Sequence, residues 1–79
     1  MKKIHLYSKD DCHLCEVVLS VLQKVQNKIP FELLVTKIFV GHPKYEKYKN
    51  EIPLVFIDGE LVFKFNIDEE KLCKKLEED

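Results

Sequence analysis

In the first third of the chain, hydrophobic residues change from alternate spacing to a spacing of three and four. Ile4 and Leu6 alternate with more polar neighbours in the run 3–8, which is typical of a strand. Directly after it, Asp10 and Asp11 stand where acceptor side chains can cap a helix. A helix with one buried face is then expected, built on Leu14, Val18, Val21, Leu22 and Val25.

The middle of the chain predicts a second strand and a short helix. Residues 31–40 are dense in Phe, Leu, Val and Ile, and the preceding helix supplies the crossover for a strand parallel to the first. Gly41-His42-Pro43 interrupts this run, and Pro43 suits the first turn of a new helix. A short and mostly polar helix is therefore expected over 45–49.

The last third predicts a hairpin. Strands are expected over 52–57 and 60–65, with Asp58-Gly59 as the two-residue turn between them. In the second of these strands, Leu61, Phe63 and Phe65 are expected to share one face.

A final helix is expected after the hairpin. Asn66 and Asp68 are both candidate caps, and Asn66 with Glu69 has the spacing of a capping box. The complete order is β-α-β-α-β-β-α, which predicts a single α/β domain over 1–79 with a four-stranded mixed sheet flanked by helices. The apolar face of the final helix is formed by Leu72, Cys73 and Leu76.

Charge and hydropathy exclude several partners. The chain has 13 basic residues, all of them lysine, against 14 acidic ones, and its net charge of −1 gives no case for nucleic acid. No apolar run approaches the length of a membrane helix, and no apolar segment of a signal peptide follows the basic start. We therefore expect a cytoplasmic protein with no membrane partner, monomeric because no long apolar stripe is left over.

Cys12-His13-Leu14-Cys15 joins the first expected strand to the first expected helix, and this context is typical of a redox Cys-x-x-Cys motif. The free N–H groups and the positive dipole end of a helix N-terminus favour a thiolate over a thiol. Cys12 is thus expected to be the reactive cysteine, with a pKa below the free value of about 8.5. Cys15, deeper in the helix, is expected to be less exposed and to serve the second step of disulfide exchange.

Metal binding is the alternative use of the same cysteines. One Cys-x-x-Cys supplies only two of the four ligands that zinc requires, so no metal site is expected within one chain. A carrier of an iron–sulfur cluster or a soft metal, bridged between two chains or completed by an external thiol, stays open as the second hypothesis.

Two neighbours of the cysteines have two readings each. His13 follows Cys12 directly and either stabilises the thiolate when charged or points into solvent. Tyr7 either lines a cleft or packs in the core. Cys73 is expected to be a small buried residue of the last helix.

Two segments resemble glutaredoxins. They are the run from Leu6 to Cys15 and the run from Ile52 to Gly59. The chain is most similar to small prokaryotic glutaredoxin-like proteins with a Cys-His-Leu-Cys centre, and the resemblance covers nearly its whole length. It implies a thioredoxin-like fold in which Cys12 attacks a disulfide and Cys15 resolves the mixed disulfide.

The resemblance also implies roles around the cysteines. It implies a cis Ile52–Pro53 bond with Pro53 facing the sulfurs, and substrate pairing with the backbone of Glu51 and Ile52. Lys9 matches a lysine that glutaredoxins keep near the nucleophile, where it stabilises the thiolate, meets a substrate carboxylate or, as a plain surface residue, does neither.

The sequence departs from glutathione-dependent glutaredoxins in two places. Glu51 and Ile52 replace a small hydroxylated residue and a valine, and residues 63–68 contain no glycine pair. The predicted function is that of a thiol–disulfide oxidoreductase in electron transport and redox homeostasis. Its substrates are expected to be disulfide-containing proteins or glutathione mixed disulfides. No organic cofactor is expected, and electrons would come from glutathione as co-substrate or, favoured by the missing glycine pair, from a thioredoxin-reductase-like flavoprotein.

Overall fold

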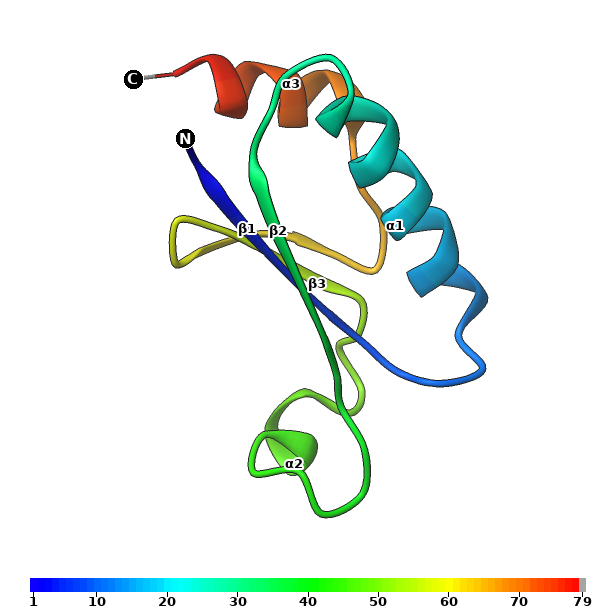
Figure 1. The fold of residues 1–79 in the computed structure, drawn as a ribbon. Coiled ribbons are helices and arrows are strands. Elements are labelled where there is room, and N and C mark those ends of the chain that lie inside the picture. Colours follow the sequence, from blue (N-terminus) through cyan, green and yellow to red (C-terminus); the bar gives the residue numbers. More distant parts are fainter. Residues whose placement is uncertain (79) are drawn as a thin grey trace.

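Four strands form one mixed sheet in the order β2-β1-β3-β4, and three helices connect or follow them (Figure 1). The computed structural model describes residues 1–78. The order of elements is the predicted one: β1 (Lys3–Ser8), α1 (His13–Gln26), β2 (Glu32–Lys37), α2 (Tyr45–Tyr48), β3 (Leu54–Ile57), β4 (Glu60–Lys64) and α3 (Glu69–Glu77).

Strand pairing follows from the connections. β1 runs parallel to β2 because α1 provides the crossover, whereas β3 is antiparallel to both β1 and β4. The tight turn between β3 and β4 is made by Asp58 and Gly59, whose φ values of 49° and 86° are both positive. Such values suit the turn type whose twist matches a hairpin, so this predicted turn is confirmed.

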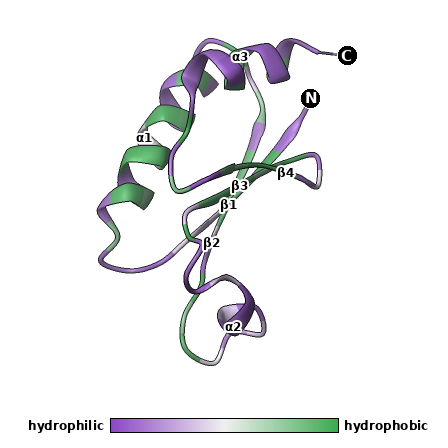
Figure 2. Cartoon of the chain, turned by 180° about the vertical axis from the view of Figure 1, so that it is seen from behind, coloured by the Kyte–Doolittle hydropathy of each residue, from purple (hydrophilic) through white to green (hydrophobic). Residues whose placement is uncertain are grey.

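One face of the sheet is covered by α1 and α3 (Figure 1). Their side chains and those of the strands form the main core, an aliphatic cluster with two phenylalanines. Figure 2 shows that α1 is the most hydrophobic helix and that α3 is mainly hydrophilic. The buried members of the main core are Ile4, Leu6, Val18, Leu22, Val25, Phe31, Val55, Ile57, Phe63, Leu72 and Leu76.

The predicted buried face of α1 is wrong at its first residue. Leu14 is 50% exposed, and Cys15 takes the buried place one residue later. The reason is that Cys12 itself is the N-cap, so the buried stripe begins at the second cysteine. Its residues are Cys15, Val18, Leu22 and Val25.

The N-terminal caps of α1 and α3 differ in part from those that the sequence predicted. Neither Asp10 nor Asp11 caps α1, because the Cys12 Sγ accepts the hydrogen bond and Asp10 pairs with Lys37 instead. For α3, Asp68 is the cap, and its carboxylate accepts from the Lys71 N–H at 3.1 Å. The alternative capping box from Asn66 is therefore not formed.

Three strands are shorter than predicted. β3 begins at Leu54 rather than at residue 52, because Pro53 has no N–H to pair with a neighbouring strand. β2 ends at Lys37 because Ile38 leaves the sheet to become buried beside the cysteines. β4 ends at Lys64. In its pairing with β3, Phe63 lies opposite Val55 and Leu61 lies opposite Phe56, so Val62 is the extra residue of a bulge. The bulge breaks the alternation expected from the sequence: Phe63 is buried, whereas Leu61 and Phe65 are exposed.

The opposite face of the sheet carries the odd-numbered side chains of β1. The one-turn helix α2 lies at one end of the molecule, away from the two chain termini (Figures 1 and 2). Its tyrosines pack with Tyr7 and Phe56 on this opposite face. Within residues 1–78, no helix is long and apolar enough to cross a membrane.

Candidate active site

Cys12 and Cys15 are joined by a disulfide at the N-terminus of α1, with their Cα atoms 5.2 Å apart. Cys12 is half-buried and has an extended backbone, whereas Cys15 is only 4% exposed. The backbone N–H of Cys15 donates to the Cys12 Sγ at 3.1 Å. The helix start therefore offers a hydrogen-bond donor to the outer sulfur, and the inner sulfur is shielded, as the sequence predicted.

A second hydrophobic cluster lies beneath the disulfide. Its buried members come from α1 and from β1, β2 and β3 or the residues that adjoin these strands. Cys12 and both tyrosines of α2 are partly buried and pack against it. We call it the cysteine cluster. It consists of Tyr7, Cys15, Ile38, Ile52 and Leu54.

Pro53 begins the β3 side of the site. The Ile52–Pro53 peptide bond is cis, as the resemblance implied, and Pro53 is fully buried. Within residues 1–78, the backbone N–H and C=O of Ile52 make no hydrogen bond to other backbone groups. Glu51 is half-exposed, and its carboxylate accepts from the Lys64 ammonium at 3.0 Å. The backbone at Ile52 is thus free to pair with an additional strand.

A hollow of about 150 Å³ lies on the β2 side of the cysteines. Both cysteines line it, together with the charged residues Lys9 and Glu16. Its apolar lining comes from Leu6, Leu19 and Val35. The disulfide therefore lies between this hollow and the β3 strand that Pro53 precedes.

Lys9, His13 and Tyr7, the predicted neighbours of the cysteines, lie in different environments. Lys9 is exposed at the hollow, and His13 is exposed as the first residue of α1. Tyr7 is buried in the cysteine cluster, so its core reading is confirmed. Its ring stacks on Tyr48 with centroids 5.4 Å apart and meets the edge of Phe56 at 5.6 Å.

Lys44 is a contributor that sequence analysis missed. Its ammonium donates to the Tyr7 hydroxyl at 2.7 Å and lies 5.1 Å from the centre of that ring. This hydrogen bond raises the pKa of Lys44 above its ordinary value. The pKa of His5 is lowered, first by burial and second by the Lys44 charge. No spacing in the sequence signals these contacts, because 37 residues separate Lys44 from Tyr7.

No metal site is apparent around the cysteines. In the described part of the chain, no group of three or more His, Cys, Asp or Glu side chains is arranged to hold a metal ion. Cys73 is half-buried on α3 rather than fully buried, and packs against the main core.

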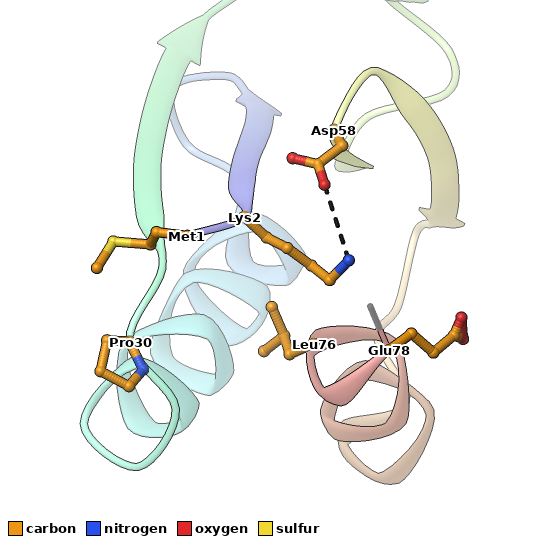
Figure 3. Close-up of a pocket in the computed structure, with 6 residues that line it drawn as sticks. All are labelled: Met1, Lys2, Pro30, Asp58, Leu76 and Glu78. Carbon is orange, nitrogen blue, oxygen red and sulfur yellow. Dashed lines mark ion pairs between the residues drawn. The ribbon is translucent and has the colours of Figure 1, made fainter.

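A larger hollow of about 390 Å³ lies at the end of the molecule that carries the chain termini (Figure 3). It is lined by residues of the N-terminus, the α1–β2 connection, the β3–β4 turn and the C-terminal end of α3, and it contains the ion pair between Lys2 and Asp58 at 3.8 Å. No cysteine lines it, so disulfide chemistry belongs to the smaller hollow.

Strand order, the Cys-x-x-Cys at a helix start and the cis-proline define a thioredoxin-fold protein with a disulfide-capable cysteine pair. Three similar proteins support this class. A glutaredoxin-like protein of Dictyostelium discoideum, described as a YDR286C homolog, is 26% identical over 80 residues, which cover 94% of this chain and 74% of that protein.

The solution structure of protein Ne2328 from Nitrosomonas europaea has a TM-score of 0.78 at 25% identity, over 94% of this chain and 89% of that one. Thioredoxin 1 of Thermosipho africanus has a TM-score of 0.66 at 21% identity, over 95% and 90% of the two chains, and shows the fold. The family model described as "Glutaredoxin-like domain (DUF836)" matches residues 3–77, and the chain belongs to this family.

Proposed function

We propose that the protein is a cytoplasmic thiol–disulfide oxidoreductase that reduces protein disulfides or glutathione mixed disulfides through Cys12 and Cys15. The observation that carries the proposal is the unequal exposure of two bonded cysteines at one helix N-terminus. The outer sulfur can meet a substrate, whereas the inner one can meet only the outer. In this proposal, Cys12 makes the first attack and Cys15 makes the second, in keeping with this asymmetry.

The reaction begins with the reduced dithiol. The Cys12 thiolate attacks one sulfur of the substrate disulfide, which forms a mixed disulfide and releases the other substrate sulfur as a thiolate that takes up a proton. Cys15 then loses its proton and attacks the Cys12 Sγ. The second substrate thiol leaves, and the Cys12–Cys15 disulfide remains, so that two electrons have passed to the substrate.

Local geometry supports the first step. The N–H of Cys15 points at the Cys12 Sγ, and a hydrogen bond to the charged form favours the thiolate. The helix dipole acts in the same direction. His13 and Lys9 stand at the same end of α1 and add positive charge there when they are protonated.

Regeneration requires an external donor of two electrons. Either two glutathione molecules or the dithiol of a thioredoxin-reductase-like flavoprotein can reduce the Cys12–Cys15 disulfide by the same exchange chemistry. The protein needs no organic cofactor for this cycle, because the dithiol is itself the redox centre. We propose that the donor is a protein and that the oxidoreductase acts as a monomer.

A redox titration tests this proposal. The purified protein is equilibrated in glutathione buffers, alkylated and analysed by mass spectrometry. A reversible Cys12–Cys15 disulfide with a midpoint of about −200 to −300 mV is expected, near the cytosolic poise. If the pair never forms an intramolecular disulfide, the dithiol mechanism is wrong and the iron–sulfur or soft-metal carrier takes its place.

Three variants assign the individual cysteines. Cys12→Ser should abolish disulfide reduction, and retained activity would refute the assignment. Cys15→Ser should accumulate mixed disulfides that mass spectrometry can detect. Cys73→Ala is the matched control, because it removes a thiol that lies on α3, and it should leave exchange unchanged.

A further inference from the structure

Phe65 has a backbone conformation that its side chain does not favour. Its φ is +67°, which lies in the left-handed region that bulky residues rarely adopt. Among residues 1–78, the other non-glycine residues with positive φ are Asp11 and Asp58, and aspartate tolerates this region more readily. Phe65 therefore carries a conformational cost that a glycine at the same place would avoid.

The main core does not account for this phenylalanine. Phe65 is 46% exposed and belongs neither to the main core nor to the cysteine cluster. A strained residue whose ring leaves the core is a reason to look for a function.

Phe65 stands directly beside the cis-proline. Its backbone N–H donates to the C=O of Pro53 at 2.8 Å, and the next N–H, that of Asn66, donates to the C=O of Lys64 at 2.7 Å. These two bonds fix the backbone from which the ring projects. They also leave the backbone of Ile52 as the free edge on which an extended substrate can pair.

A second apolar side chain is exposed within the cysteine motif. Leu14 lies between the two cysteines, is 50% exposed and belongs to neither hydrophobic cluster. Leu14 thus lies half-exposed within the Cys-x-x-Cys, and Phe65 lies half-exposed directly after β4, beside Pro53. A peptide strand bound at Ile52 gains affinity from its backbone, and selectivity comes from the side chains that it meets.

We propose that Phe65 sets the substrate class of this site: it selects protein disulfides in extended segments with an apolar residue next to the cysteine, over hydrophilic disulfides such as glutathione mixed disulfides. This inference rests on the proposed oxidoreductase function. The exchange steps are unchanged, and the ring acts by covering the apolar neighbour of the substrate cysteine. The strained backbone of Phe65 then has an explanation, because a conformation suited to glycine is occupied by a ring that contacts substrate.

Two peptide disulfides test the proposal with the full-length protein. They have the same length and net charge, and their cysteine is flanked either by leucines or by serines. For the unaltered protein, kcat/KM should be about tenfold higher with the leucine peptide, the factor expected from partial burial of an apolar side chain. In Phe65→Ala this ratio should fall below about threefold, mainly through a higher KM for the leucine peptide.

The matched control is Leu61→Ala, which removes a 40% exposed side chain from β4 near the hairpin turn. It should keep the tenfold preference. An unaltered protein with no preference between the peptides, or a Phe65→Ala variant that keeps the preference, would overturn the proposal. Failure of the oxidoreductase function looks different, because neither peptide would then be reduced in a way that depends on Cys12.

A pair of variants separates the ring from the backbone. Phe65→Ala and Phe65→Gly both lack the ring, but only glycine relieves the left-handed strain. Phe65→Gly should therefore unfold at a higher urea concentration than Phe65→Ala, while both variants show the same reduced selectivity. If selectivity returns in Phe65→Gly, the backbone rather than the ring determines it and the proposal is wrong.

Discussion

The two faces of the sheet are packed by different kinds of side chain. Under α1 and α3 the packing is mainly aliphatic and closed to solvent, with Leu6 and Leu22 fully buried. On the opposite face, aromatic rings of β1, β3 and α2 pack together and Lys44 donates to Tyr7. We therefore expect the first face to provide most of the stability, whereas the second contributes the aromatic side chains of the cysteine cluster and its border.

This difference has a physical cause. Aliphatic side chains fill a closed space densely, whereas tyrosine combines an apolar ring with a hydroxyl that reaches water or a partner. Only one turn of helix covers the opposite face, so its side chains have to be stable beside solvent. A polar contact between His5 and Thr36, at 2.8 Å, is one example on this face.

The largest expected effect is that of Leu22→Ala in the main core. The substitution leaves a cavity in a closely packed region and should lower the free energy of unfolding by about 2–5 kcal/mol. Urea denaturation measures it. Val17→Ala on the exposed side of the same helix should change stability by no more than about 0.5 kcal/mol. A small effect of Leu22→Ala would mean that the main core is not the dominant source of stability.

Tyr48→Ala tests the opposite face. It removes a ring that packs on Tyr7 and Phe56, and the expected loss is about 1–2 kcal/mol, smaller than that of Leu22→Ala. The same urea experiment gives the value, with Asn50→Ala as an exposed control from the adjoining segment. A loss equal to that of Leu22→Ala would remove the distinction between the two faces.

Asp68→Ala tests how α3 is held over the first face. The Asp68 carboxylate satisfies a free N–H of the helix, so its removal should cost about 1 kcal/mol of stability. Asn66→Ala serves as the control because Asn66 is the cap that the structure does not use. If both variants lose the same stability in thermal or urea unfolding, capping by Asp68 is not the cause.

The smallest expected effect is a pH dependence from His5. The pKa of His5 lies below its ordinary value of 6.5 in the folded protein, so the unfolded chain binds the proton more readily. Stability from this group is complete above pH 6.5 and should decrease as the pH falls from there through the lower folded-state pKa. Urea midpoints between about pH 7.5 and 5 should show this decrease.

Two histidine variants isolate this effect. In His5→Phe the decrease with falling pH should be smaller than in the unaltered protein. His13→Gln should retain the full decrease, because His13 is exposed at the helix start. Equal pH dependence in His5→Phe and the unaltered protein would show that other groups cause it.

Sequence analysis succeeded where the signal is local. The order of elements, the Asp58-Gly59 turn and the placement of Cys12 at a helix start each follow from a few adjacent residues. It failed where two distant segments compete for one role. Asp10 is a plausible cap by position, but Lys37 pairs with it, and Cys12 caps the helix instead.

The sequence by itself determined the α/β element order, the Cys-x-x-Cys at a helix start and which cysteine is the outer one. Hydrophobic periodicity and helix-end chemistry act within one or two turns, so these features need no knowledge of distant segments. Only the tertiary structure decided that Leu14 is exposed, that Lys44 reaches Tyr7 and that Phe65 stands beside Pro53. The exposure of Leu14 depends on which residue caps α1, and the other two contacts depend on which segments become neighbours once the sheet has formed.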